Sequence, residues 1–207
     1  MNDLTTLQQI SVLVLPVLFA ITLHEAAHGW MAGRLGDATA RMLGRVTLNP
    51  IRHIDPVGTL LVPVGTFLLT GFLFGWAKPV PVTWNNLRQP RRDMALVAFA
   101  GPAANLLMLL LWALVLKLAT LLLGSSEWIA RPLMYMGSAG VLINAILMVL
   151  NLLPIPLLDG GQIAYQVAEM AKGSPVSEKV QAVGNSLGLA LLVMFMGLAF
   201  YNDIVGL

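Results

Sequence analysis

Apolar and polar stretches alternate along the chain in long blocks, and five of these blocks are apolar. They cover about residues 10–35, 57–76, 94–123, 133–153 and 187–201. A helix needs about 20 apolar residues to cross a bilayer, and the first, third and fourth blocks exceed that length. The fifth reaches it when Val183 and its neighbours are included. The pattern predicts an all-α polytopic membrane protein, built as a bundle of four to five transmembrane helices.

The second block differs from the others because Pro63 and several glycines interrupt it. Basic residues flank it on both sides, and basic loops collect on the cytoplasmic side of a membrane. A crossing here would place one basic loop outside, so we expect residues 57–76 to re-enter, with a fifth crossing as the alternative. In the four-span topology, ten of the twelve Lys and Arg residues are cytoplasmic: Arg34, Arg41, Arg45, Arg52, Lys78, Arg88, Arg91, Arg92, Lys172 and Lys179.

Composition agrees with this prediction. The chain is 57% hydrophobic and 11% charged, whereas soluble domains carry about 25% charged residues. No polar stretch is long enough to fold alone, so we expect residues 1–207 to form one transmembrane domain. The net charge of +2 gives no basis for a nucleic-acid partner, and the absence of cysteine excludes disulfides and thiolate metal ligands.

The first apolar block carries the sequence His24-Glu25-Ala26-Ala27-His28. Positions i and i+4 share one face of a helix, so both imidazoles can bind one metal ion, with Glu25 as a general base beside them. The alternative is a pair of packed histidines and a structural glutamate, but ionisable groups inside a membrane span are by default functional. His24 follows Ile10 by about 21 Å of helix rise, which predicts a site in the cytoplasmic third of the membrane.

A third ligand is needed, because catalytic zinc commonly takes three protein ligands and leaves one position for water. We expect it to be Asp159, which follows the helix-ending Pro154 and Pro156 and precedes two glycines that permit a tight turn. The alternative role for Asp159 is the N-cap of a helix that begins near Gln162. His53 and Asp55 are rival ligands, although His53 is more readily explained as a structural group that bonds a loop carbonyl.

Two asparagines lie in apolar helices and need hydrogen-bond partners. Asn105 belongs to the sequence Gly101-Pro-Ala-Ala-Asn105, and hydrogen bonding between helices explains it better than contact with substrate. Asn151 lies about one turn before the proline break, where it could bond a substrate carbonyl or a developing oxyanion. For Asn151 this role and interhelical bonding are equally supported.

Together these features resemble the site-2 protease family of intramembrane zinc metalloproteases. The shared residues are the HExxH sequence at 24–28, the GPxxN sequence at 101–105 and the N-x-x-P-x-P-x-x-D-G string from Asn151 to Gly160. The resemblance is to the short bacterial-type branch without a PDZ domain. It implies Zn²⁺ on His24, His28 and Asp159, Glu25 as catalytic base, and substrate positioning by Asn151.

The resemblance also implies the class of substrate. Family members cleave helical transmembrane segments of membrane proteins. From the basic loops and the depth of His24, we expect the site on the cytoplasmic side of a bacterial inner membrane. A helical substrate must unwind first, because a helix protects its own carbonyls. Residues 39–48 carry a weak β pattern around Gly44 and predict a short β-hairpin near the cytoplasmic face. We hypothesise that its edge receives the unwound substrate by strand addition.

Two other functions are compatible with a metal site in a membrane protein. A divalent-metal transporter would need polar residues on several helices near mid-membrane, whereas the polar cluster here is predicted near one face. A non-catalytic scaffold, or pseudoprotease, would bind without needing the carboxylate of Glu25. A Glu25→Gln variant distinguishes these alternatives, because only a protease loses its function with that change.

Overall fold

The computed structural model describes residues 5–62, 64–66 and 75–205, and this part of the chain is helical, without any strand. Four long helices account for most of it: α1 (Thr6–Leu35), α4 (Pro90–Leu122), α5 (Glu127–Leu152) and α7 (Glu178–Val205). The shorter elements are α2 (Thr39–Met42), the 3₁₀ turn η1 (Pro50–His53), the π-helical turn η2 (Pro56–Leu61), the 3₁₀ turn η3 (Trp84–Asn86) and α6 (Asp159–Lys172).

Three helices of the described chain are long and apolar enough to cross a membrane, namely Leu7–Leu35, Pro90–Leu122 and Glu127–Leu152. They correspond to the first, third and fourth apolar blocks, so the predictions of helices there are confirmed. Their side chains are apolar all round rather than on one face, as expected when lipid instead of water surrounds a bundle. The protein is therefore an integral membrane protein.

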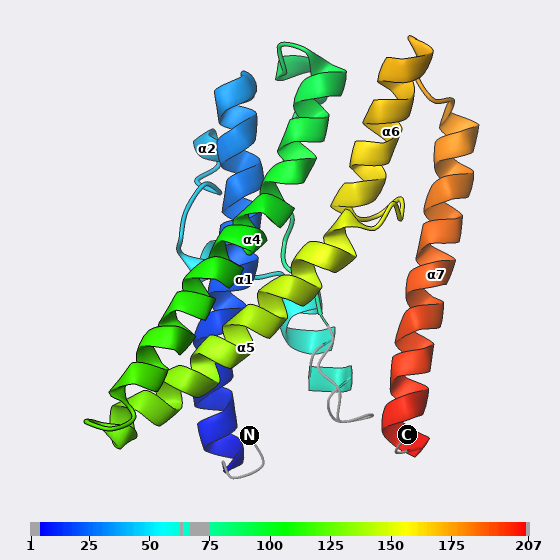
Figure 1. Ribbon diagram of the computed structural model, residues 1–207. Helices are drawn as coiled ribbons and strands as arrows, with labels where there is room; N and C mark the ends of the chain where they lie inside the picture. The colour runs from blue at the N-terminus through cyan, green and yellow to red at the C-terminus, as the bar shows by residue number, and fades with distance from the viewer. Residues whose placement is uncertain (1–4, 63, 67–74, 206–207) are drawn as a thin grey trace.

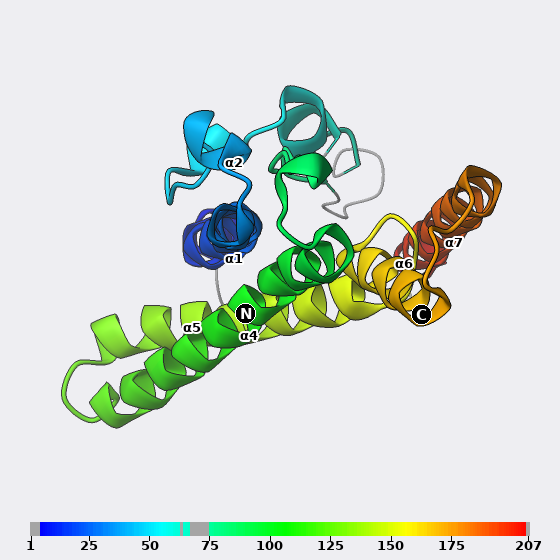
Figure 2. The ribbon, with the colours of Figure 1, turned by 90° about the horizontal axis from the view of Figure 1, so that it is seen from above.

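Helix α4 occupies the centre of the fold and packs against α1, α5 and α6. Figures 1 and 2 show α4 and α5 side by side, with α1 against one side of this pair and α6 continuing upward from the end of α5. Small residues on α5 allow the close approach to α4. A Cβ added to Gly140 would lie 2.2 Å from Cγ of Trp112, and one added to Gly137 would lie 2.8 Å from Cβ of Leu116.

The prediction of a β-hairpin at residues 39–48 is wrong, because Thr39–Met42 form helix α2 and Gly44 turns the chain with a φ of +64°. The fully buried carboxylate of Asp37 explains the difference. It accepts hydrogen bonds from the backbone N–H and the hydroxyl of Thr39, at 3.0 and 2.5 Å. This cap-like interaction begins a helix at Thr39 and outweighs the weak β preference of the residues that follow.

Asp37 also ties the end of α1 to the segment before α4. It accepts from the backbone N–H of Thr83 at 2.6 Å and from Nδ2 of Asn86 at 2.9 Å. Burial alone would raise the pKa of this carboxyl group, but the hydrogen bonds from Thr39, Asn86 and Thr83 lower it below its usual value. The ionised carboxylate thereby holds two segments together that lie more than 40 residues apart in sequence.

The two ends of the second apolar block lie next to each other. Its first turn is η2, and the backbone N–H of Trp76 donates to the carbonyl oxygen of Gly58 at 2.9 Å. The hydroxyl of Thr59 donates to the carbonyl oxygen of Trp76 at 2.8 Å. Residues 67–74, in the middle of the predicted re-entrant segment, lie outside the described residues.

Helix α7 stands apart from the α1–α4–α5 bundle in Figure 1. Two glycines bring it against the loop that follows α5 and against a side chain of α6. A Cβ on Gly188 would lie 3.2 Å from Cδ of Pro156, and one on Gly184 would lie 2.2 Å from the hydroxyl of Tyr165. The helix predicted for residues 187–201 is confirmed, and it begins earlier, at Glu178.

Candidate metal centre

Helix α1 presents His24 and His28 on one face, one turn apart, and each residue is 9% exposed. Their Nε2 atoms are 3.1 Å apart, and the two rings meet edge to face with centroids 4.7 Å apart. The spacing of the HExxH sequence predicts this shared face, and the structure places the two imidazoles accordingly.

The other nitrogen of each imidazole is held by a hydrogen-bond acceptor. Nδ1 of His24 lies 2.6 Å from Oδ1 of Asn105, and Nδ1 of His28 lies 2.7 Å from the carbonyl oxygen of Val97. An acceptor at Nδ1 requires a proton there, so each neutral imidazole turns the lone pair of Nε2 toward its neighbour. This is the tautomer in which Nε2 can bind a metal ion.

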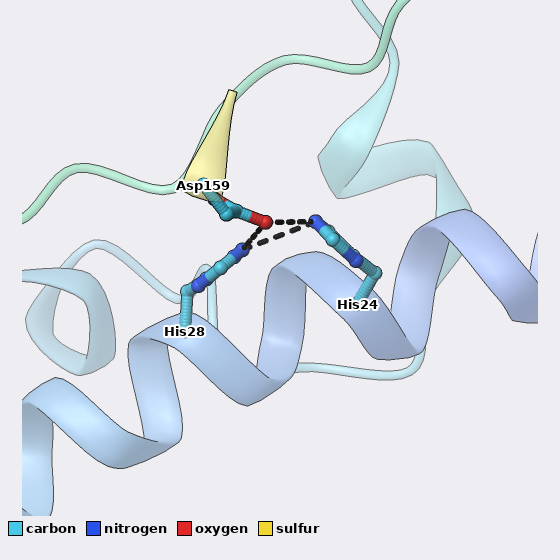
Figure 3. Close-up of side chains that lie close together, drawn as sticks. All are labelled: His24, His28 and Asp159. Atoms are coloured by element: carbon cyan, nitrogen blue, oxygen red, sulfur yellow. Dashed lines mark hydrogen bonds and ion pairs between the residues drawn. The ribbon is translucent and has the colours of Figure 1, made fainter. Parts of the chain in front are cut away.

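Asp159 completes the cluster from the first residue of α6. Its Oδ2 lies 3.2 Å from Nε2 of His24 and 3.5 Å from Nε2 of His28, and Figure 3 shows the three side chains converging. The helix begins at Asp159 itself, with Leu158 at the N-cap and no side-chain cap, so the carboxylate does not serve as an N-cap.

The geometry of these three atoms fits one tetrahedral metal ion. Ligand atoms about 2.0–2.1 Å from a tetrahedral zinc ion lie about 3.3 Å from one another, and the three separations here are 3.1, 3.2 and 3.5 Å. With neutral imidazoles, three lone pairs face one another, and the buried Oδ2 of Asp159 has no hydrogen-bond partner. A cation relieves this repulsion. Among the described residues, His24, His28 and Asp159 are the only such cluster of three metal-ligating side chains.

Glycines allow the helices to close around the cluster. A Cβ on Gly101 would lie 2.4 Å from Nε2 of His28 and 2.6 Å from Cε1 of His24, so α4 can approach the imidazoles only without a side chain there. At the start of α6, a Cβ on Gly160 would lie 2.3 Å from the carbonyl oxygen of Leu153, and one on Gly161 would lie 2.2 Å from that of Ile155. These two glycines let the first turn of α6 lie close against the chain that ends α5, which brings Asp159 to the imidazoles.

A buried chain of amides continues from His24 across three helices. Asn105 accepts from His24 and donates through Nδ2 to the carbonyl oxygen of Ala20 at 3.2 Å and to Oδ1 of Asn144 at 3.0 Å. Asn144 in turn donates to the carbonyl oxygen of Gly140 at 2.8 Å. Both amides are fully buried. Asn144 is not among the site residues predicted from the sequence, although a lone amide in an apolar span is a signal that points to it.

The remaining candidates do not belong to the cluster of three metal-ligating side chains. Asn105 has both amide atoms occupied inside the bundle, so the expectation of interhelical bonding explains it and a contact with substrate does not. Asn151 is half-buried and donates to the carbonyl oxygen of Leu147 at 3.0 Å. His53 bonds the carbonyl oxygen of Thr47 at 3.1 Å through Nε2, and Asp55 accepts from the first backbone N–H groups of η2, which are structural roles.

Glu25 follows His24 on α1 and is half-buried. Its Oε2 accepts a hydrogen bond of 2.8 Å from the backbone N–H of Val80. The sequence gives no side-chain signal for this partner, since the donor is a main-chain group far along the chain.

Comparisons with known proteins agree with the site. The model of the family described as Peptidase family M50 matches residues 125–195. A relative from Bacillus subtilis (strain 168), named "Putative zinc metalloprotease YwhC", is 35% identical over 187 residues, which cover 89% of this chain and 80% of the relative. No solved structure matches the chain.

Two further relatives align over smaller shares of their own length. Rip2 of Mycolicibacterium smegmatis, whose name also describes a zinc metalloprotease, is 35% identical over 86% of this chain and 64% of the relative. Protease RseP of Photorhabdus luminescens is 47% identical over 30% of this chain and 27% of the relative. The near full-length similarity to YwhC and the match to the family model agree with the resemblance seen in the sequence. The chain therefore belongs to peptidase family M50, the site-2 protease family of intramembrane zinc metalloproteases.

Proposed function

We propose that His24, His28 and Asp159 hold the zinc ion of this metalloprotease and that Glu25 is its general base. The observation that carries this proposal is the convergence of Nε2, Nε2 and Oδ2 at the separations of one tetrahedral metal site. A bound zinc ion in such a site supplies an acidified water molecule and polarises a peptide carbonyl.

The residues around the ion then divide the remaining work. Glu25 removes a proton from the attacking water and delivers it to the amine that leaves when the C–N bond breaks, so the proton balances over the reaction. Asn105 and Val97 keep both imidazoles in the metal-binding tautomer. Asn151, half-buried one turn before the end of α5, is proposed to hold the substrate carbonyl.

We propose that the substrate is a transmembrane helix of another membrane protein, cut within or next to its span. Residues 1–207 would act as one domain in the lipid bilayer, with α7 as a fourth span. The second block would re-enter, which is supported by the contact between Gly58 and Trp76 at its two ends. The ends of a crossing segment would lie about 30 Å apart.

The distribution of basic residues supports a site that faces the cytoplasm. Arg34 and Arg45 on one side of the second block, and Arg91 and Arg92 on the other, belong to the end of the bundle where α1 finishes and α4 begins. Since basic loops are cytoplasmic, this end would lie at the inner face of a bacterial inner membrane. His24 and His28 lie in the half of α1 nearest to it.

The direct test is cleavage by the purified protein in lipid vesicles that contain single-span substrate proteins. We expect cleavage with zinc bound, loss of cleavage after a chelator such as 1,10-phenanthroline, and recovery when zinc is returned. Fragments are identified by mass spectrometry, which locates the cut relative to the span. Cleavage that persists in metal-free protein would contradict the proposal.

The amide chain predicts a measurable effect on the metal. Asn105→Leu removes the acceptor for Nδ1 of His24, and Asn144→Leu removes a partner of Asn105, so we expect zinc affinity to fall by about 10- to 100-fold for Asn105→Leu and by less for Asn144→Leu. Affinity is measured by competition with a chromophoric chelator. Asn151→Leu on the same helix as Asn144 is the matched control and should leave zinc affinity unchanged. Zinc affinities equal to that of the wild type in all three variants would show that the amides do not support the metal site.

A further inference from the structure

Between Trp76 and Val80 the chain belongs to no helix, and every second residue donates its backbone N–H group to a nearby acceptor. Trp76 donates to the carbonyl oxygen of Gly58 at 2.9 Å, Lys78 to that of His53 at 2.9 Å, and Val80 to Oε2 of Glu25 at 2.8 Å. In extended backbone, successive residues point their N–H groups to opposite edges. Donors on every second residue are therefore the pattern that an extended segment gives along one edge. The third bond in the series falls on the carboxylate of Glu25 instead of on a backbone carbonyl.

The sequence around Val80 leaves no competing donor. Pro79 and Pro81 lack an N–H group, so Val80 carries the only backbone donor between Lys78 and Val82. The two prolines lie on the opposite edge, which they prevent from forming a ladder with another strand. Near Glu25, the segment therefore has one backbone N–H group to donate, that of Val80.

Side chains hold the segment at this register. Cγ1 of Val80 lies 3.0 Å from where a Cβ on Gly29 would be, so Val80 rests on α1 one turn after Glu25. Arg45, which is buried, donates through Nη2 to the carbonyl oxygens of Lys78 and Pro79 at 2.7 and 3.3 Å. A shift by one residue would move the N–H of Val80 to the other edge, and these contacts oppose that shift.

We propose that the backbone amide of Val80 is a positioning group for the general base. Pro79 and Pro81, which have no N–H group, leave this amide as the one backbone donor for Glu25. By holding Oε2, the amide fixes the carboxylate and leaves Oε1 to exchange the proton with water and with the leaving amine. The inference rests on the proposed role of Glu25. It assigns Val80 no contact with substrate or metal, so its loss should slow the chemical step alone.

The test compares two substitutions at one position. Val80→Pro removes the N–H group, and Val80→Ala keeps it while trimming the side chain that rests on Gly29. We expect Val80→Pro to lower kcat by about 10- to 100-fold, the range expected for a misplaced catalytic group, with KM within about 2-fold and zinc content unchanged. Val80→Ala should retain most of kcat. Ala77→Pro, a proline placed on the opposite edge, controls for the stiffness that proline adds.

If Val80→Pro does not fold, replacement of the amide by an ester at Val80 removes the same hydrogen atom and tests the same claim. A full kcat in Val80→Pro or in the ester variant overturns the inference. So does a loss confined to KM, which would make the segment a substrate site, or a loss of zinc. An inactive wild type, or an active Glu25→Gln variant, overturns the proposed function itself. The inference alone fails when Glu25→Gln is inactive and the ester variant is fully active.

Discussion

Glu25→Gln is expected to lower kcat for peptide-bond cleavage by about 10²- to 10⁴-fold while zinc remains bound, because a positioned base contributes a factor of that size. The amide of glutamine has nearly the size of the carboxylate and still offers an oxygen to the N–H of Val80. It cannot take a proton from water at neutral pH. Cleavage is measured on a single-span substrate in vesicles, and zinc is counted by mass spectrometry of the digested protein.

The same variant separates the protease from the other functions that the sequence allows. A transporter or a scaffold would keep its activity in Glu25→Gln, since neither needs a base beside the metal. Normal zinc content with normal cleavage would remove Glu25 from the mechanism. Loss of zinc together with cleavage would instead mean that Glu25 supports the metal site.

Gly101→Ala is expected to lower zinc affinity by about 100-fold or more, at the upper end of what changes next to metal ligands cost. The added methyl group would lie 2.4 Å from Nε2 of His28 and 2.6 Å from Cε1 of His24, well inside van der Waals contact. Either α4 moves away from α1 or the imidazoles turn out of the cluster. Both outcomes separate His24 and His28 from Asp159. Zinc retention during dialysis against a weak chelator is the measurement.

Helix propensity cannot explain such a loss, because alanine is more favourable than glycine within a helix by about 1 kcal/mol. Gly197→Ala in α7 is the matched control, since a Cβ there meets no atom within 4 Å. It should leave zinc affinity and cleavage unchanged. Wild-type zinc affinity in Gly101→Ala would mean that α4 does not pack against the imidazoles as described.

The long helices could be predicted because their signal is local and repeated. Each contains a long, mostly apolar run, and a helix satisfies its own backbone hydrogen bonds, as lipid requires. The residues at 24–28 could be placed on one face because helix geometry fixes the spacing. Asp159 could be proposed because Pro154 and Pro156 end one helix and the two glycines that follow Asp159 permit a tight turn. Its distance from the imidazoles is a tertiary fact that the order of residues does not contain.

The parts that could not be predicted depend on contacts between distant segments. The prediction of a hairpin at residues 39–48 was wrong because hydrogen bonds to the carboxylate of Asp37, including those from Thr83 and Asn86, fix the conformation of this part of the chain. The link from His24 through Asn105 to Asn144 joins three helices, and a list of polar residues does not give its order. The hydrogen bond to Glu25 comes from the backbone of Val80, which carries no side-chain signal at all.

We expect one zinc ion to bind His24, His28 and Asp159 together. X-ray absorption at the zinc edge tests it most directly, with purified wild-type protein compared with Asp159→Ala. The account predicts two imidazole nitrogens and one carboxylate oxygen at about 2.0–2.2 Å in the wild type, and loss of the carboxylate ligand in the variant. An identical ligand set in both proteins would contradict it, because Asp159 would then not reach the metal.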